Sequence, residues 1–89
     1  MSDYFVTVYT NTGCGPCTAT KAYLGKYGIR FTEENAAENP LVRDALIDQG
    51  FKQFPVVLYD IPGIGSGSWS GHESEKLEEL RWLIHGPTV

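Results

Sequence analysis

The most constraining feature of this 89-residue chain is the segment Cys14-Gly15-Pro16-Cys17, which holds its only two cysteines. It follows a strand-like run at residues 4–10, and a helical pattern begins with it, so both sulfurs should lie on the first turn of a helix. Residues i and i+3 share a helix face with Cβ atoms about 5–6 Å apart, close to what a disulfide needs. A crosslink that closes so short a loop adds little stability. The spacing therefore favours a disulfide that opens and closes in thiol–disulfide exchange.

The position of this segment at a helix N-terminus also predicts its chemistry. The nucleophile in thiol–disulfide exchange is the thiolate, and a helix N-terminus offers unpaired N–H groups and about half a positive charge. This field lowers the pKa of a thiol at the tip by about one unit. Cys14 is therefore the expected attacking group, and Cys17, one turn deeper, is the expected resolving group that releases a mixed disulfide. Pro16 fits the first helical turn, where its missing N–H costs nothing.

Composition and charge limit the partners. A chain of 89 residues, with 42% hydrophobic and 20% charged side chains, is typical of a single globular domain spanning residues 1–89. The net charge of −4 and the lack of a run of Lys or Arg argue against nucleic acid as a partner. No apolar stretch approaches the roughly 20 residues of a membrane span, and residues 1–4 lack the features of a secretory signal. We therefore expect a cytoplasmic protein without a membrane partner, and nothing in the sequence demands more than a monomer.

A metal site is not expected. In a reducing compartment, two cysteines separated by two residues are more often catalytic or metal-binding than structural. Structural zinc requires four ligands, and the set of Cys14, Cys17, His72 and His85 lacks the usual spacing. The sequence thus favours a redox pair.

Hydrophobic periodicity and helix caps predict seven elements. Strands are expected at residues 5–10, 29–34, 55–59 and 68–70. Helices are expected at residues 16–27, at 40–48, and from a capping box of Ser70 and Glu73 to about residue 85. Residues 61–67, with four Gly or Pro, are expected to form a flexible turn. The order strand-helix-strand-helix-strand-strand-helix predicts an α/β fold, with a four-stranded mixed sheet flanked by three helices.

The second helix has the clearest apolar stripe. Asn39 is the expected N-cap and Pro40 the first helical residue. The side chains expected to be buried are Leu41, Val42, Ala45 and Leu46.

The residues that surround these elements resemble those of a known family. The landmarks are Cys14-x-x-Cys17, Thr18-Ala19-Thr20, Gly28-Ile29, Phe54-Pro55-Val56-Val57 and Trp69-Ser70-Gly71. Together they resemble the thioredoxin fold in its short, glutaredoxin-sized form, and within it the NrdH-type redoxins. The resemblance covers nearly the whole chain.

This resemblance implies an electron donor without a bound cofactor. Electrons would pass from NADPH through a flavoprotein thioredoxin reductase to the cysteine pair, and then to ribonucleotide reductase or another protein disulfide. The Phe54-Pro55 bond would be cis, and its turn would expose the Phe54 backbone to an incoming peptide. Trp69 could pack in the core or form a docking surface. The resemblance implies partner contacts at Thr12, Gly13, Phe54, Pro55, Trp69, Ser70 and Gly71.

Some positions depart from the family patterns. Glutaredoxins and NrdH-type proteins carry Lys-Pro shortly before the first cysteine, where this chain has Asn11 and Thr12. The missing ammonium argues against glutathione as the main reductant. The buried acid that thioredoxins place six residues before the first cysteine is Val8 here, so the proton of Cys17 must pass to water or another group. After Trp-Ser-Gly, His72 begins a segment unlike that of NrdH-type proteins, so partner contacts there are expected to differ.

Three alternatives remain open from the sequence. A glutathione-dependent glutaredoxin would turn over faster with glutathione than with thioredoxin reductase. A non-catalytic thioredoxin-fold binding module, such as a subunit of a phage or host replication complex, would keep its partner when both cysteines are replaced. An iron–sulfur carrier would be coloured after anaerobic purification.

Overall fold

The computed structural model describes residues 4–86 and forms four strands, three α-helices and one 3-10 helix. In chain order the elements are β1 (Phe5–Thr10), α1 (Gly15–Lys26), β2 (Thr32–Asn35), the 3-10 helix η1 (Ala36–Glu38), α2 (Pro40–Asp48), β3 (Val56–Ile61), β4 (Gly65–Ser70) and α3 (Ser74–His85). Residues 1–3, which belong to the predicted domain and to the segment where no secretory signal was expected, lie outside the described residues, as do residues 87–89.

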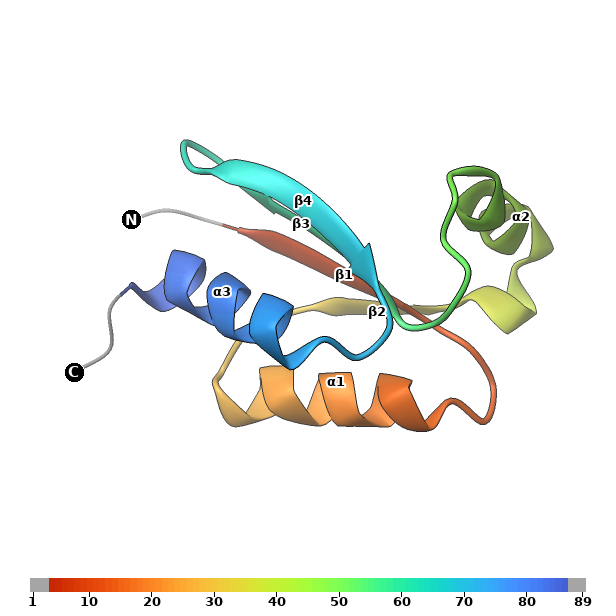
Figure 1. Cartoon of the computed structure of the whole chain (residues 1–89), viewed down its shortest axis with the longest axis horizontal. Coiled ribbons are helices and arrows are strands. Elements are labelled where there is room, and N and C mark those ends of the chain that lie inside the picture. The colour runs from red at the N-terminus through yellow and green to blue at the C-terminus, as the bar shows by residue number, and fades with distance from the viewer. Residues whose placement is uncertain (1–3, 87–89) are drawn as a thin grey trace.

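The sheet has the predicted mixed topology, in the order β2-β1-β3-β4. β1 is central and pairs in parallel with β2 and antiparallel with β3, which in turn pairs antiparallel with β4. The C-terminal end of β1 therefore lies beside the N-terminal end of β3 and the C-terminal end of β4. This end of the sheet leads directly into α1, as Figure 1 shows. The thioredoxin fold expected from the sequence is confirmed.

Helices α1 and α3 cover one face of the sheet (Figure 1) and form the main core with it. Side chains alternate along β1, so that Val6, Val8 and Thr10 point into this layer. Leu24 of α1 and Leu77 of α3 are fully buried between the helices and the sheet. Burial of a side chain of this size stabilises the fold by about 1.5–3 kcal/mol. The core also includes Ile29, Val57, Ile61, Trp69 and Leu80.

The second strand begins later than the sequence predicts, at Thr32 rather than at residue 29. The reason is the way α1 ends. Gly28 adopts a φ of +66°, which favours glycine, and the N–H of Ile29 donates to the carbonyl oxygen of Leu24 at 2.9 Å. Ile29 is buried and closes the end of α1, so it cannot also pair with β1.

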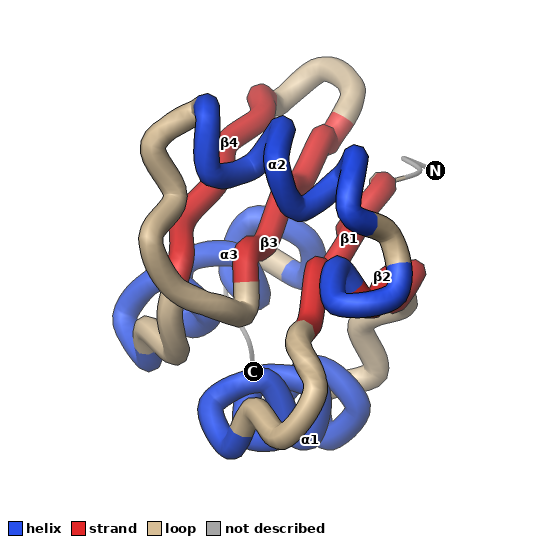
Figure 2. Tube along the Cα trace, turned by 90° about the vertical axis from the view of Figure 1, so that its right-hand side faces the viewer, coloured by secondary structure: helices blue, strands red, loops and turns tan. Residues whose placement is uncertain are grey.

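Helix α2 has the predicted bounds but not the predicted packing. Only Leu46 of its apolar stripe is buried, Val42 is half-buried, and Leu41 is 82% exposed. In Figures 1 and 2 the helix stands toward the end of the sheet where β1 stops, on the side opposite α1, and it packs mainly on η1. The prediction of a fully buried stripe is therefore wrong, because α2 packs mainly on the short helix η1 rather than on the sheet. Asn39 precedes the helix as predicted, but its side chain makes no capping hydrogen bond.

The last helix and the hairpin before it also differ from expectation. β4 begins at Gly65, because Ile61 pairs with Gly65 and the N–H of Ile64 donates to the carbonyl oxygen of Ile61 at 2.9 Å. The expected flexible segment is thus a tight turn. Ser70 belongs to β4 and pairs with Val56, so it cannot cap the helix, and α3 begins only at Ser74.

The different burial of two helical leucines predicts different costs of truncation. Leu24→Ala should lower the free energy of unfolding by about 2–5 kcal/mol, because it leaves a cavity in the core. Leu41→Ala should change it by less than about 0.5 kcal/mol, because this side chain is exposed. Urea denaturation of the two variants measures both values. If Leu41→Ala lowered the free energy of unfolding as much as Leu24→Ala, Leu41 would be buried, as the sequence predicted.

Candidate active site

The two cysteines form a disulfide at the N-terminus of α1, with their Cα atoms 5.2 Å apart. Gly13, with a φ of +70°, turns the chain after β1, and Cys14 then takes the N-cap position of the helix. The N–H of Cys17 donates to Cys14 Sγ, with 3.1 Å between nitrogen and sulfur. Cys14 Sγ thus accepts a hydrogen bond from one of the helix amides that have no partner within the helix. The same contact would stabilise negative charge on this sulfur once the disulfide is reduced.

The two cysteines differ in accessibility. Cys14 is half-buried, whereas Cys17 is 2% exposed and faces the core side of α1. Gly15 and Pro16 between them are exposed. A partner sulfur approaching from solvent can therefore reach Cys14 more readily than Cys17.

Two other predicted segments meet at the same end of the sheet. The Phe54-Pro55 bond is cis, as the resemblance implied, and lies directly before β3. The N–H of Gly71, directly after β4, donates to the carbonyl oxygen of Pro55 at 2.8 Å. Phe54 is half-buried, and Pro55 and Gly71 are buried. A Cβ at Gly71 would lie 3.1 Å from the Gln53 side chain, so this glycine allows the two segments to pack closely.

The segment Trp69-Ser70-Gly71 is more buried than a docking surface would be. Trp69 is 7% exposed and its ring packs in the core with Tyr59, at 6.2 Å between ring centroids. Of the two roles left open for this side chain, the structure shows core packing. Ser70 is half-buried at the end of β4. His72 lies beyond this segment, before α3, and its Nδ1 is 2.9 Å from the hydroxyl oxygen of the buried Thr20 on α1.

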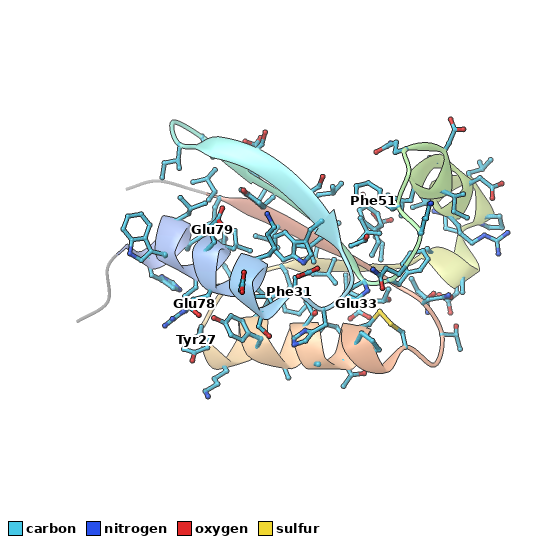
Figure 3. All side chains as sticks on the ribbon, viewed as in Figure 1. Tyr27, Phe31, Glu33, Phe51, Glu78 and Glu79 are labelled. Carbon is cyan, nitrogen blue, oxygen red and sulfur yellow. A yellow bond between two sulfur atoms is a disulfide. The ribbon has the colours of Figure 1, made fainter. Side chains whose placement is uncertain are left out.

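A polar cleft of about 660 Å³ opens beside the disulfide. Both cysteines line it, together with the predicted contact residues Thr12 and Gly13. Figure 3 shows the disulfide in yellow at the start of α1, near the labelled Glu33, which also lines this cleft. The remaining lining residues are Thr10, Asn11, Gly15, Thr18, Lys21, Asn35 and Glu38.

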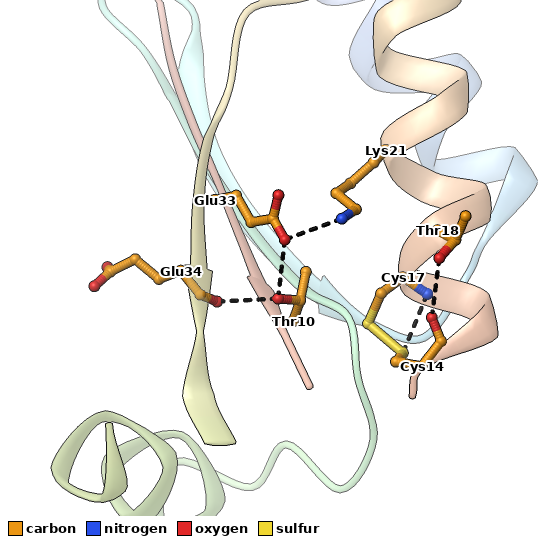
Figure 4. Close-up of polar contacts among 7 residues, drawn as sticks. All are labelled: Thr10, Cys14, Cys17, Thr18, Lys21, Glu33 and Glu34. Atoms are coloured by element: carbon orange, nitrogen blue, oxygen red, sulfur yellow. Dashed lines mark hydrogen bonds and ion pairs between the residues drawn. A yellow bond between two sulfur atoms is a disulfide. The ribbon is translucent and has the colours of Figure 1, made fainter. Parts of the chain in front are cut away.

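Three side chains in this cleft form a connected polar group (Figure 4). Lys21 Nζ lies 3.0 Å from Glu33 Oε2. The Thr10 hydroxyl lies 3.3 Å from the same Oε2 and 3.4 Å from the Glu34 carbonyl oxygen, and it can donate its proton to either acceptor. Thr10 is 3% exposed, whereas the side chains of Lys21 and Glu33 are 32% and 42% exposed. The group therefore extends from the buried end of β1 to the solvent.

The neighbouring residue Glu34 faces away from this cleft. It pairs with Tyr9 in the sheet register, whereas Glu33 pairs with Val8, whose side chain points toward α1. Burial, followed by the negative charge of Glu34, raises the pKa of Tyr9 above its usual value. The two adjacent glutamates of β2 thus lie on opposite faces of the sheet.

The sequence interpretation missed Thr10, Lys21 and Glu33. Lys21 follows Cys17 by four residues, which places both on one face of α1, and this spacing was the available signal for it. Glu33 could not be found in this way, because its position depends on the register of β2 against β1.

Two features are absent from the described part of the chain. Residues 4–86 contain no group of three or more His, Cys, Asp or Glu side chains arranged to hold a metal ion. No helix among these residues has the length and apolar character needed to cross a membrane.

Comparison with known proteins agrees with this geometry. The glutaredoxin family profile matches residues 6–61. The glutaredoxin-like protein NrdH of Escherichia coli K12 is 36% identical over 84 residues, which cover 94% of this chain and 98% of the relative. NrdH of Lactococcus lactis subsp. cremoris is 36% identical over 75 residues, covering 84% and 97% of the two chains.

A solved structure shows the same likeness. The NrdH-redoxin of Escherichia coli, described as a glutaredoxin-like protein with a thioredoxin-like activity profile, superposes with a TM-score of 0.74 at 36% identity, covering 84% of this chain and 92% of the other. The chain therefore belongs to the glutaredoxin family of thiol–disulfide oxidoreductases and, within it, resembles the NrdH redoxins.

Proposed function

We propose that the reduced chain donates two electrons to protein disulfides. The Cys14 thiolate attacks one sulfur of the target disulfide, forms a mixed disulfide, and releases the other target sulfur as a thiolate. Cys17 then attacks Cys14 Sγ, forms the Cys14–Cys17 disulfide, and releases the second target sulfur. The observation that carries this assignment is the accessible Cys14 Sγ, which accepts the N–H of Cys17 at the tip of α1.

A flavoprotein thioredoxin reductase is the proposed source of electrons, with NADPH as their origin. Redoxins of this family have no prosthetic group, so the cysteine pair itself carries the electrons. Glutathione would bring two carboxylates to the site. Among the described residues that line the cleft, Lys21 is the only cation, and Glu33 already pairs with it. This pairing supports thioredoxin reductase over glutathione as the reductant.

The target is proposed to be ribonucleotide reductase or another disulfide-bearing protein. Thr12 and Gly13 lie on the exposed loop beside Cys14, where a target segment must approach. A target peptide in extended conformation can pair with the backbone near Phe54 and Pro55, while Ser70 and Gly71 flank it. The buried Trp69 would support this surface from beneath rather than contact the target.

We place this reaction in the cytoplasm, where thiols are kept reduced. The chain is proposed to act as a single domain and as a monomer. No nucleic acid or membrane takes part in the proposed reaction.

Cysteine replacement tests the two roles. Cys14→Ser should abolish the reduction of insulin disulfides, because the remaining thiol, Cys17, is only 2% exposed. Cys17→Ser should instead accumulate a mixed disulfide with the target, visible by non-reducing electrophoresis and lost on addition of dithiothreitol. Normal insulin reduction by the Cys14→Ser variant would contradict the mechanism.

Parallel assays test the source of electrons. With NADPH and thioredoxin reductase, the wild-type chain should reduce insulin at least about tenfold faster than with NADPH, glutathione and glutathione reductase. The reason is that Lys21, the one cation among the described residues that line the cleft, already pairs with Glu33. NADPH consumption measures both rates under matched conditions. Faster turnover with glutathione would identify the chain as a glutathione-dependent glutaredoxin.

A further inference from the structure

The resolving step requires a proton acceptor near Cys17. Cys17 is 2% exposed, and its thiol must lose a proton before the sulfur can attack Cys14. Burial disfavours the charged thiolate, so a nearby group that takes the proton should speed this step. The following inference rests on the function proposed above.

The cleft beside the disulfide contains two carboxylates, Glu33 and Glu38, and they differ in how they are held. Glu33 lies on the strand next to β1, and both Lys21 and Thr10 donate to its Oε2. Glu38 ends the 3-10 helix η1 and is exposed, and its side-chain carboxylate has no hydrogen-bond or ion-pair partner within residues 4–86. Of these two carboxylates, only Glu33 is therefore held in place by other side chains within the cleft that both cysteines line.

We propose that Glu33 accepts the proton of the Cys17 thiol through one water molecule in the cleft. The thiol gives its proton to the water, and the water gives a proton to the Glu33 carboxylate. The Cys17 thiolate then forms a bond to Cys14 Sγ, while the bond from Cys14 Sγ to the target sulfur breaks and its electron pair leaves with the target. The protonated Glu33 returns the proton to the departing thiolate or to solvent.

Lys21 and Thr10 act as positioning residues in this scheme. The Thr10 hydroxyl comes from the buried end of β1 and holds the Glu33 side chain toward α1, as Figure 4 shows. The Lys21 ammonium joins the same oxygen from α1, the helix that carries both cysteines. A partly exposed ion pair of this kind contributes only about 0–1 kcal/mol to stability, so replacing Glu33 should leave the chain folded.

A two-phase thiol reaction separates the two cysteine steps. Reduced protein is mixed with dithiobis(nitrobenzoate) in a stopped-flow instrument. Attack by Cys14 releases one nitrothiobenzoate and leaves a mixed disulfide, and resolution by Cys17 releases the second. The rates of both phases are recorded from about pH 6 to about pH 9 for the wild type, Glu33→Gln, Thr10→Val and Glu34→Gln. Circular dichroism confirms that each variant is folded.

Glu33→Gln should slow the second phase by at least about tenfold at neutral pH and should not slow the first phase, because loss of a nearby negative charge favours the Cys14 thiolate. Its second-phase rate should then rise about tenfold per pH unit, because it depends only on ionisation of the thiol itself. Thr10→Val should slow the second phase less than Glu33→Gln does. It removes one of the two donors that hold the Glu33 carboxylate, and Lys21 remains. Glu34→Gln is the matched control, because it removes the same charge from the other face of β2 and should leave both phases unchanged.

If Glu33 acted only through its negative charge, Glu33→Gln would change the second-phase rate in the opposite direction from the proposal. Removing the negative charge of Glu33 would favour the Cys17 thiolate and speed the second phase, so an equal or faster second phase in Glu33→Gln would overturn the proposal. A similar slowing in Glu34→Gln would also overturn it. Failure of the proposed function would look different: the wild type would lack the first phase, or Cys14→Ser would keep it.

Discussion

The amide of Cys17 and the sulfur of Cys14 form the contact on which the chemistry of this chain depends. This hydrogen bond forms because β1 ends at Thr10 and the chain turns at Gly13. The turn places Cys14 at the N-cap position of α1. At this start of α1, Cys14 is half-buried and Cys17 is buried. In the proposed mechanism, the helix backbone stabilises negative charge on Cys14, and the difference in exposure sets the order in which the two sulfurs react.

The sheet brings the other parts of the site to that helix. Since β1 is antiparallel to β3, the segment before Val56 returns to the end where β1 stops, and the antiparallel β4 brings Gly71 to the same place. The hydrogen bond between Gly71 and Pro55 joins these two segments at this end of the sheet. The proposed partner contacts at Phe54, Pro55 and Gly71 therefore lie at the end of the sheet where β1 leads into the cysteine pair.

Local patterns predicted the fold and the cysteine site because their signals lie within short stretches of sequence. The spacing of Cys14 and Cys17 and the strand before them can be interpreted without knowledge of tertiary contacts, whereas the cis Phe54-Pro55 bond was expected only from the resemblance to the NrdH-type redoxins. The packing of α2 and the position of Glu33 could not be predicted in this way. Leu41 lies in a regular apolar stripe that the sheet leaves uncovered, and Glu33 reaches the cleft only because β2 pairs with β1 in one particular register.

The placement of α2 has a dynamic consequence. A helix that buries little more than Leu46 has few tertiary contacts to protect it, so it can open locally while the core between α1, α3 and the sheet remains intact. Its amide protons would then exchange with solvent at rates set by this local opening, whereas those of β1 and β3 would require global unfolding. Slow amide exchange that requires global unfolding is therefore expected in β1, which carries Thr10, and in β3, which carries Val56. These paired strands would stay ordered while α2 opens locally.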